Sequence, residues 1–146
     1  MQANIRSWEA MLHAYALVMR EMETTHVEKG IIPLSWYDAL ITLNHAERPL
    51  RMNELADAML VSRSATTRFV DRLEKAGFVQ RSQSEEDRRG YDISLTEVGL
   101  RALREASPVH LELIESLFLR HLDETDSHEL ERIMGKVIRA QPRSEV

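Results

Sequence analysis

Hydroxyl and cationic side chains gather on one face of a helical pattern that begins at Ser62. The Ser62 hydroxyl is suited to an N-cap, because it can accept a hydrogen bond from a free backbone N–H two or three residues later. Counted from that cap, Thr66, Phe69, Val70 and Leu73 share one face, and Ser64, Thr67, Arg68, Asp71 and Lys75 share the other. Small hydroxyl residues let a backbone approach DNA, and an arginine can bind a guanine edge or a phosphate.

A second cationic site lies in a polar loop. Residues 78–83 and 91–95 favour β-strands, and residues 84–90 between them are polar and end in glycine. Arg88 and Arg89 lie in this loop, and the negative potential of a narrow DNA minor groove attracts arginine. The alternative is an ordinary solvated loop, because Glu85, Glu86 and Asp87 directly precede the arginines.

A shorter helical pattern precedes Ser62. Its apolar face is formed by Leu55, Ala56, Met59 and Leu60, and Val61-Ser62 leaves room only for a tight turn. Two helices joined so closely must cross steeply, as in a helix-turn-helix, whose second helix lies in the DNA major groove. A polar front on the second helix is by itself weak support for DNA binding, because most surface helices have one. The hairpin predicted after this helix would form a wing.

The charge distribution bears on a DNA partner. The whole chain carries a net charge of −5. Residues 61–95 hold seven Lys/Arg and six Asp/Glu, a net of +1, so the remaining twelve and eighteen give −6. The excess acid therefore lies outside the predicted DNA-contacting segment. Because this segment is nearly neutral, we expect few phosphate contacts and binding by groove fit as well as counterion release.

Residues from about 50 to 99 resemble the winged helix-turn-helix of the MarR (multiple antibiotic resistance regulator) family. The resemblance rests on NELADAMLVSRSATTRFVDRLEKAGFVQR followed by EEDRRGYDISLTEVG, in which Asp87-Arg88, Leu95-Thr96 and Gly99 are the most specific element. It implies a mainly α fold with a small β-hairpin wing. Residues 34–99 would form the winged helix-turn-helix, with a recognition helix at about 63–76 and a wing at about 78–95.

The same resemblance assigns roles to single residues. Four positions of the recognition helix match positions that meet bases or phosphates in the family: Ser62, Ser64, Thr67 and Arg68. Arg88 matches a wing-tip arginine placed in the minor groove, Arg89 lies at a more variable position, and Asp87 matches an acid that orients an arginine near the wing base. Ala65-Thr66 departs from a more usual small-polar-then-aliphatic pair. Arg51 stands where a capping Ser or Thr is common, so we expect a weaker helix start there and an arginine available to a phosphate.

Apolar stripes flank the predicted winged helix. A first helix at about 5–29 carries Ile5, Trp8, Met11, Leu12, Tyr15, Val18, Met19 and Met22. Beyond the wing, Thr96 can cap a long helix that Pro108 is expected to kink or divide, and a last helix is predicted at residues 127–139. These stripes exceed what a compact winged helix of ~50 residues can cover.

We therefore predict a single MarR-like domain over residues 1–146 that forms a homodimer. Residues 1–32 and 104–146 would supply the dimerisation helices, and twofold symmetry would place two recognition helices ~34–36 Å apart on double-stranded DNA. The alternative is a monomeric helical bundle that buries the same stripes internally.

Other chemistry is poorly supported. The six histidines have no metal-ligand spacing, and no phosphate loop or nucleophile–base pair is present, so we predict no metal, no cofactor and no enzymatic activity. Zero cysteines exclude disulfides and thiol-based sensing and favour a cytoplasmic protein. No apolar run approaches the ~20 residues of a membrane span. Four aromatic residues could line a pocket for a small aromatic or phenolic effector, although plain core is the commoner role: Trp8, Tyr15, Trp36 and Tyr37.

These observations predict a DNA-binding transcriptional regulator. The resemblance implies a dimeric repressor of nearby genes that binds a pseudo-palindromic operator and is released by a small-molecule signal. The alternative is a winged-helix protein–protein interaction module without sequence-specific DNA binding, which the nearly neutral DNA-contacting segment would allow.

Overall fold

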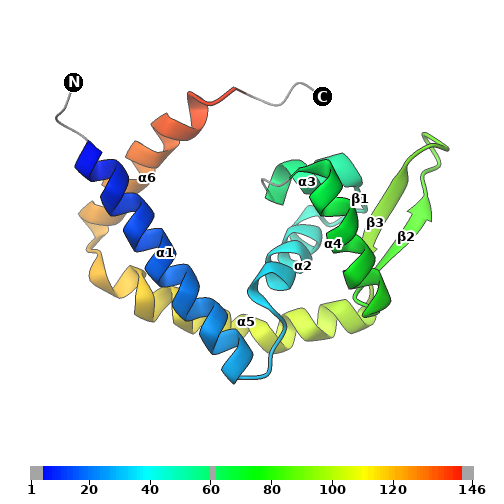
Figure 1. The fold of residues 1–146 in the computed structure, drawn as a ribbon, viewed down its shortest axis with the longest axis horizontal. Helices are drawn as coiled ribbons and strands as arrows, with labels where there is room; N and C mark the ends of the chain where they lie inside the picture. The colour runs from blue at the N-terminus through cyan, green and yellow to red at the C-terminus, as the bar shows by residue number, and fades with distance from the viewer. Residues whose placement is uncertain (1–4, 60–61, 143–146) are drawn as a thin grey trace. The chain divides into compact units, whose positions relative to one another are not determined.

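The computed structural model describes residues 5–59 and 62–142, which form mainly helices and one small sheet (Figure 1). The elements in chain order are α1 (Ile5–Glu28), α2 (Leu34–Ala46), β1 (Leu50–Arg51), α3 (Met52–Met59), α4 (Arg63–Lys75), β2 (Val79–Gln83), β3 (Tyr91–Leu95), α5 (Glu97–Leu117), η1 (Leu119–His121) and α6 (Glu124–Arg139). The prediction of a mainly α fold with a β-hairpin wing is confirmed. Among the described residues, no helix is both long and apolar enough to cross a bilayer.

The chain forms two compact units. Residues 23–108 form the larger unit, and the described parts of residues 1–22 and 109–146 form the smaller one. The sequence set the limits of the winged-helix region at 34 and 99. The larger unit extends past both limits, because it also contains the last six residues of α1 and the first half of α5.

α3 and α4 form the helix-turn-helix of the larger unit. The N-cap predicted at Ser62 is confirmed, because its hydroxyl accepts a hydrogen bond from the Ala65 N–H at 3.2 Å. Past the end of α4, Gly77 has φ +79°, the left-handed conformation in which helices commonly end at a glycine. Leu60, predicted on the apolar face of the first of these helices, and Val61, at the predicted turn, lie outside the described residues.

An antiparallel sheet of order β1-β3-β2 adjoins these helices. β2 and β3 pair along their whole length and form the predicted wing. The sequence did not predict β1, in which Leu50 lies opposite Ile93 and Arg51 lies opposite Asp92. Two residues cannot show an alternating pattern, so this strand is defined by its pairing with β3 and not by local periodicity.

The core of the larger unit lies where α2, α3, α4 and the sheet meet. Fully buried side chains from these elements include Leu40, Leu55, Thr66, Val70, Leu73 and Ile93. The predicted inward face of α4 is therefore confirmed, with Phe69 also only 9% exposed. Burial of a large apolar side chain stabilises a fold by about 1.5–3 kcal/mol, so the buried apolar face of α4 fixes this helix against the core.

The two C-terminal helices differ from the prediction in their limits. α5 continues through Pro108 as one helix, so the proline does not divide it, although the boundary between the two units falls directly after this residue. α6 begins at Glu124, earlier than the predicted residue 127. A capping box explains the earlier start: the Asp123 carboxylate accepts from the Asp126 N–H at 2.8 Å, and the Asp126 carboxylate accepts from the Asp123 N–H at 3.2 Å.

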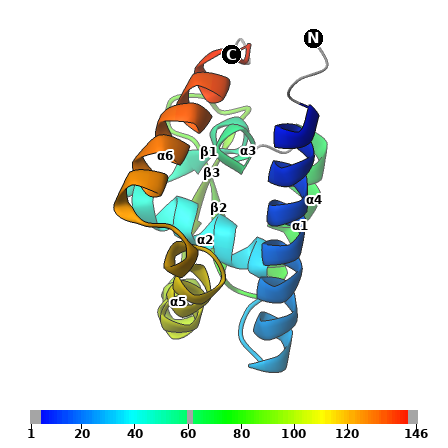
Figure 2. The same cartoon turned by 90° about the vertical axis from the view of Figure 1, so that its left-hand side faces the viewer.

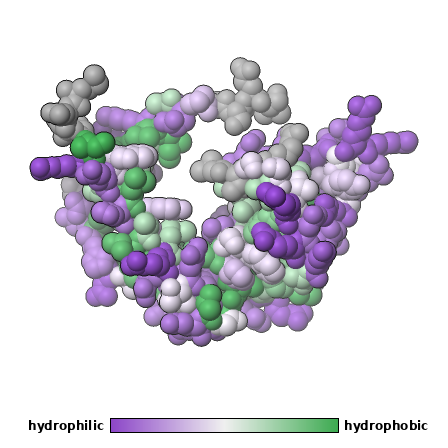
Figure 3. Space-filling view, viewed as in Figure 1, coloured by the Kyte–Doolittle hydropathy of each residue, from purple (hydrophilic) through white to green (hydrophobic). Residues whose placement is uncertain are grey.

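The smaller unit contains an apolar groove of about 530 Å³, which is lined by side chains of α1 and α6 and by Phe118. The two helices lie opposite one another in Figure 2. The lining residues are Ser7, Ala10, Met11, Ala14, Tyr15, Val18, Phe118, Leu130, Ile133 and Met134. Several other large apolar side chains of these helices are at least half exposed, including Ile5, Trp8, Val137 and Ile138. Figure 3 shows hydrophobic residues gathered over both helices.

Candidate nucleic-acid interface

The exposed front of α4 is polar. Ser64, Thr67 and Arg68 are all exposed on this front, opposite the buried face. Ser62 is also exposed, and its hydroxyl lies 3.3 Å from the Ser64 hydroxyl in addition to capping the helix. The first N–H groups of a helix and its positive dipole end favour a bound phosphate. The four residues predicted to contact DNA therefore lie together over the first two turns of α4.

Arg81 joins α4 to strand β2. Its guanidinium donates hydrogen bonds to the carboxylates of Asp71 and Glu74, the latter at 2.9 Å. Burial alone would lower the pKa of Arg81, but the hydrogen bonds to these two carboxylates outweigh burial and raise it. This link could not be predicted from the sequence, because residues ten apart on different elements share no periodic pattern. The link fixes one strand of the wing against the helix that carries Arg68.

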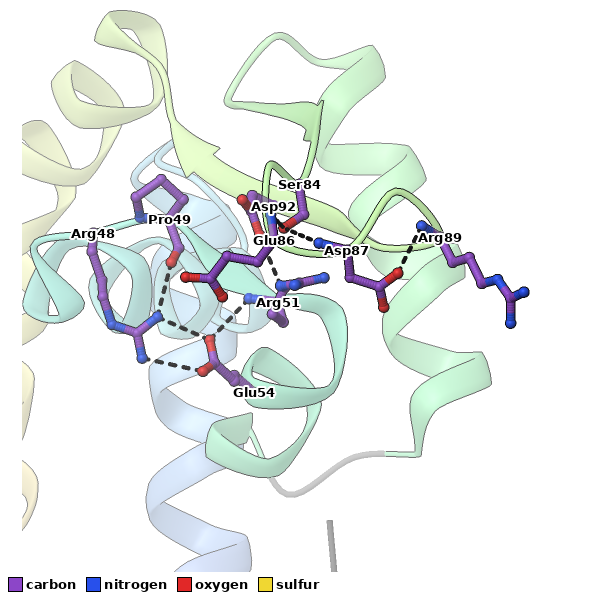
Figure 4. A network of polar contacts seen from close by, with 9 residues as sticks. All are labelled: Arg48, Pro49, Arg51, Glu54, Ser84, Glu86, Asp87, Arg89 and Asp92. Atoms are coloured by element: carbon purple, nitrogen blue, oxygen red, sulfur yellow. Dashed lines mark hydrogen bonds and ion pairs between the residues drawn. The ribbon is translucent and has the colours of Figure 1, made fainter.

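The turn of the wing is organised by its own polar groups. The buried Ser84 hydroxyl accepts hydrogen bonds from the N–H groups of Glu86 and Asp87 at 3.3 and 3.4 Å. The Ser84 N–H donates to the Gly90 carbonyl at 3.0 Å, and the Asp87 carboxylate accepts from the Arg89 N–H at 3.0 Å. In Figure 4 the Arg89 side chain extends away from the turn.

The contact that Asp87 makes in the structure differs from the one that the resemblance implies. The resemblance made it the acid that orients an arginine near the wing base, but its carboxylate binds a backbone N–H within the turn. The carboxylate that binds an arginine side chain at the wing base is Asp92. Arg88 and Arg89 are both exposed, and within the described chain neither forms an ion pair. Both arginines are therefore accessible to a polyanion.

Arginines and carboxylates alternate at the wing base (Figure 4). The Arg48 guanidinium donates to both carboxylate oxygens of Glu54, at 3.0 and 3.2 Å, and Glu54 also accepts from the Arg51 N–H at 3.0 Å. The hydrogen bond from Arg48, followed by the one from Arg51, lowers the pKa of Glu54. Glu54 thus supplies one half of a capping box at the start of α3, where the sequence analysis expected a weak helix start. The Arg51 side chain is bound to Asp92, with 3.2 Å between Nε and Oδ1, and is not turned to solvent as a phosphate ligand would be.

Thr96 connects the end of α4 to the start of α5. Its hydroxyl donates to the Gly77 carbonyl at 2.6 Å and accepts from the Gly99 N–H at 3.0 Å. The predicted cap of α5 at Thr96 is therefore confirmed. These bonds unite α4, the wing and α5 in one framework.

Comparison with known proteins places this framework in a family. The profile of the MarR family matches residues 32–91. An uncharacterized HTH-type transcriptional regulator from Bacillus cereus ATCC 10987 is 30% identical over 126 residues, which cover 86% of this chain and 83% of that protein. The chain belongs to the MarR family.

Two further comparisons extend this result. The transcriptional repressor MprA from Escherichia coli K12 is 38% identical over 104 residues, which cover 68% of this chain but only 57% of MprA. The chain thus matches little more than half the length of that relative. Sco3205, a MarR family transcriptional regulator from Streptomyces coelicolor solved in complex with DNA, aligns with a TM-score of 0.91 and 28% identity, covering 100% of this chain and 92% of that chain. The names of all three relatives describe regulators of transcription and not enzymes.

The remaining candidate residues have other surroundings. Trp36 packs edge-to-face on Phe78, with ring centroids 5.4 Å apart, and the buried Tyr37 hydroxyl lies 3.2 Å from that of Ser107. These two aromatic residues are part of the packing of the larger unit, whereas Trp8 and Tyr15 are exposed in the smaller one. Across residues 5–59 and 62–142, no three His, Asp or Glu side chains gather closely enough to hold a metal ion.

Proposed function

We propose that this MarR family member is a DNA-binding transcriptional regulator, acting as a dimeric repressor of nearby genes at a pseudo-palindromic operator. The front of α4 would enter the major groove, and the wing arginines would enter the adjacent minor groove. The observation that carries the proposal is the exposed front of α4 and the exposed wing turn on one hydrogen-bonded framework. The Sco3205 complex supports it, because a member similar over the whole chain was solved with DNA.

The ion pairs formed by residues 61–95 favour DNA binding more than the net charge of this segment does. Of the six carboxylates between residues 61 and 95, three are bound to arginines: Asp71 and Glu74 to Arg81, and Asp92 to Arg51. In the described chain, Arg68, Arg88 and Arg89 form no ion pair. Arg51 lies outside residues 61–95 and offsets the charge of Asp92, so the charge around the proposed DNA-contacting surface is more positive than the net of +1 indicates.

The groove of the smaller unit supports the dimer. An apolar groove of about 530 Å³ lies beside several large apolar side chains that are at least half exposed, and exposed apolar patches of this kind mark sites of protein interaction. A second copy presents the same helices and can cover the groove by twofold symmetry. Met134→Asp should shift the protein towards monomer in analytical ultracentrifugation, and Val98→Asp, an exposed apolar residue of the larger unit, should not. An equally stable dimer of Met134→Asp would exclude this interface.

Release by a small aromatic or phenolic effector is the regulatory part of the proposal, and it is supported by the family resemblance alone. We also place the protein in the cytoplasm, together with the DNA that it would bind. Addition of a panel of aromatic acids and phenols to a preformed protein–DNA complex tests the effector. A compound that lowers the fraction of bound DNA would support it.

The DNA function is tested by selecting fragments of the chain's own genome with the purified protein and measuring their affinity by fluorescence anisotropy at two salt concentrations. We expect the observed association constant to fall steeply with salt. Arg68→Ala and Arg88→Ala should both weaken binding, and Arg101→Ala, an exposed arginine outside the helix-turn-helix and wing, should not. Recovery of no fragment, or binding without salt dependence, would favour the protein-interaction alternative.

A further inference from the structure

Arg51 contacts the wing at two places. Its backbone lies opposite Asp92 in the pairing of β1 with β3, and its Nε lies 3.2 Å from the Asp92 carboxylate. Its guanidinium also lies against Gly90, the last residue of the wing turn. A β-carbon placed on Gly90 would overlap Nη1 of Arg51 and would lie 3.4 Å from its Cζ. The side chain therefore crosses from the start of α3 to the turn that carries Arg88 and Arg89.

Backbone conformation does not explain the glycine at position 90. The glycines with positive φ are Gly30 and Gly77. An alanine at position 90 would thus find a permitted backbone. The nearest atoms that it would meet belong to Arg51, with the Asp87 carbonyl oxygen at an ordinary 3.7 Å. The absence of a side chain at position 90 makes room for the guanidinium.

The other end of Arg51 is anchored to the helix-turn-helix. Its backbone N–H donates to the carboxylate of Glu54 in α3. The same carboxylate accepts hydrogen bonds from Nη1 and Nη2 of Arg48. The Arg51 and Asp92 side chains are only 26% and 27% exposed, so water competes weakly for their ion pair. A continuous path of polar contacts therefore connects the start of α3 to Asp92 in strand β3 of the wing (Figure 4).

We propose that Arg51 is a positioning residue for DNA binding, which sets the angle of the wing against the helix-turn-helix without contacting DNA itself. This inference rests on the proposed function. Strands of five residues extend roughly 17 Å, so a rotation of about 10° at the base moves the turn by ~3 Å. A minor groove is about 6 Å wide, so such a shift would misplace an inserted arginine.

The test is a double-mutant cycle on the full chain, with DNA recovered in the genomic selection. Arg51→Ala should weaken binding by roughly 5- to 10-fold in the wild-type background. In a background that already carries Arg88→Ala and Arg89→Ala, it should weaken binding less than about twofold, because the side chains that it positions are gone. An equal loss in both backgrounds would overturn the proposal.

Three further variants separate positioning from a direct phosphate contact. Arg51→Lys keeps the charge but lacks the planar guanidinium, whose Nε binds Asp92 and whose Nη1 lies against Gly90, so it should not restore affinity. Recovery of wild-type affinity by lysine would show a phosphate contact and refute positioning. Arg48→Ala removes an equal charge that is hydrogen-bonded to Glu54 and interacts with the wing carboxylates Asp92 and Glu86 only through longer-range electrostatics, so it should cost less than Arg51→Ala. Gly90→Ala should reproduce the loss in the wild type and should add nothing when Arg51 is already alanine.

Hydrogen exchange of the free protein tests the positioning role of Arg51 without DNA. Arg51→Ala should increase amide exchange in residues 84–90 and leave exchange in α4 unchanged. A thermal unfolding curve of the variant checks that it is folded. Unchanged exchange in the turn would refute the positioning role even if wild-type binding is strong. If the wild type selects no DNA, the proposed function fails, and the exchange result still decides whether Arg51 holds the wing.

Discussion

Replacement of Gly99 by alanine is expected to lower the free energy of unfolding, whereas the same replacement at Gly135 is expected to raise it. Both glycines lie within helices, Gly99 in the first turn of α5 and Gly135 in the third quarter of α6. Alanine is favoured over glycine in helices by up to about 1 kcal/mol. Helix propensity alone therefore predicts the same sign at both positions.

The surroundings of the two glycines differ. A β-carbon on Gly99 would overlap the carbonyl oxygen of Phe78 and would lie 2.9 Å from the carbonyl carbon, whereas carbon atoms pack at about 3.5–4.0 Å. This carbonyl cannot turn aside easily, because it accepts the Thr96 N–H at 3.1 Å. On Gly135 the nearest atom is Nη1 of Arg139 at 3.1 Å, the end of a flexible exposed side chain.

The magnitudes follow from these contacts. Overpacking costs about 1–3 kcal/mol, so Gly99→Ala should be destabilised by roughly 1–2 kcal/mol after the gain in propensity. Gly135→Ala should gain up to about 1 kcal/mol. Urea unfolding at one fixed protein concentration measures both, because a dimer makes stability depend on concentration. A Gly99→Ala variant as stable as the wild type would show that the contact with Phe78 relaxes freely and would refute the reasoning.

Three other perturbations test the site. Arg68→Ala should cost ~1–3 kcal/mol of binding at the preferred sequence and change base preference, whereas Arg88→Ala should weaken all sequences alike and reduce the salt slope by about 1, as competition titrations can show. Arg81→Ala should destabilise the fold by about 1 kcal/mol in urea unfolding, because it leaves two partly exposed carboxylates of α4 unpaired. The pKa of Glu54 is lowered, so its stabilising contribution is complete above its ordinary value of 4.5 and is lost as the pH falls through the lowered pKa. Glu54→Gln should therefore lose less stability than the wild type between pH 7 and acid, as thermal unfolding across this range can show.

Elements defined by local chemistry could be predicted from the sequence. The cap of Ser62 and the inward face of α4 depend on residues within two or three helical turns of one another, and both are present as predicted. The hairpin was predictable for the same reason, because two β-favouring runs flank a polar loop that ends in Gly90. The start of the last helix was predicted wrongly, because the local sequence there is compatible with two different structures. Asp123 to Asp126 could indicate a break or a capping box, and the capping box is what the structure contains.

Contacts between distant segments could not be predicted in this way. β1 consists of two residues that pair with β3 some forty positions later, and no periodic pattern marks them. The same holds for Arg51, whose sequence position suggested a missing cap and whose side chain binds Asp92. Asp87 stood beside two arginines in sequence, yet its carboxylate closes the turn that presents them.

The difference between residues that could and could not be predicted from the sequence follows from the two requirements of a DNA-binding surface. Residues that would touch DNA must be exposed on a regular element or loop, so Arg68 and Arg88 could be proposed from the sequence pattern together with the family resemblance. Residues that set the distance and angle between the two contacting parts must bridge separate elements, so Arg51 and Arg81 are visible only in the folded chain. Two chains with the same recognition helix and the same wing arginines can therefore present them at different angles. Exchange of residues such as Arg51 between them should alter which DNA is bound while every contacting side chain stays the same.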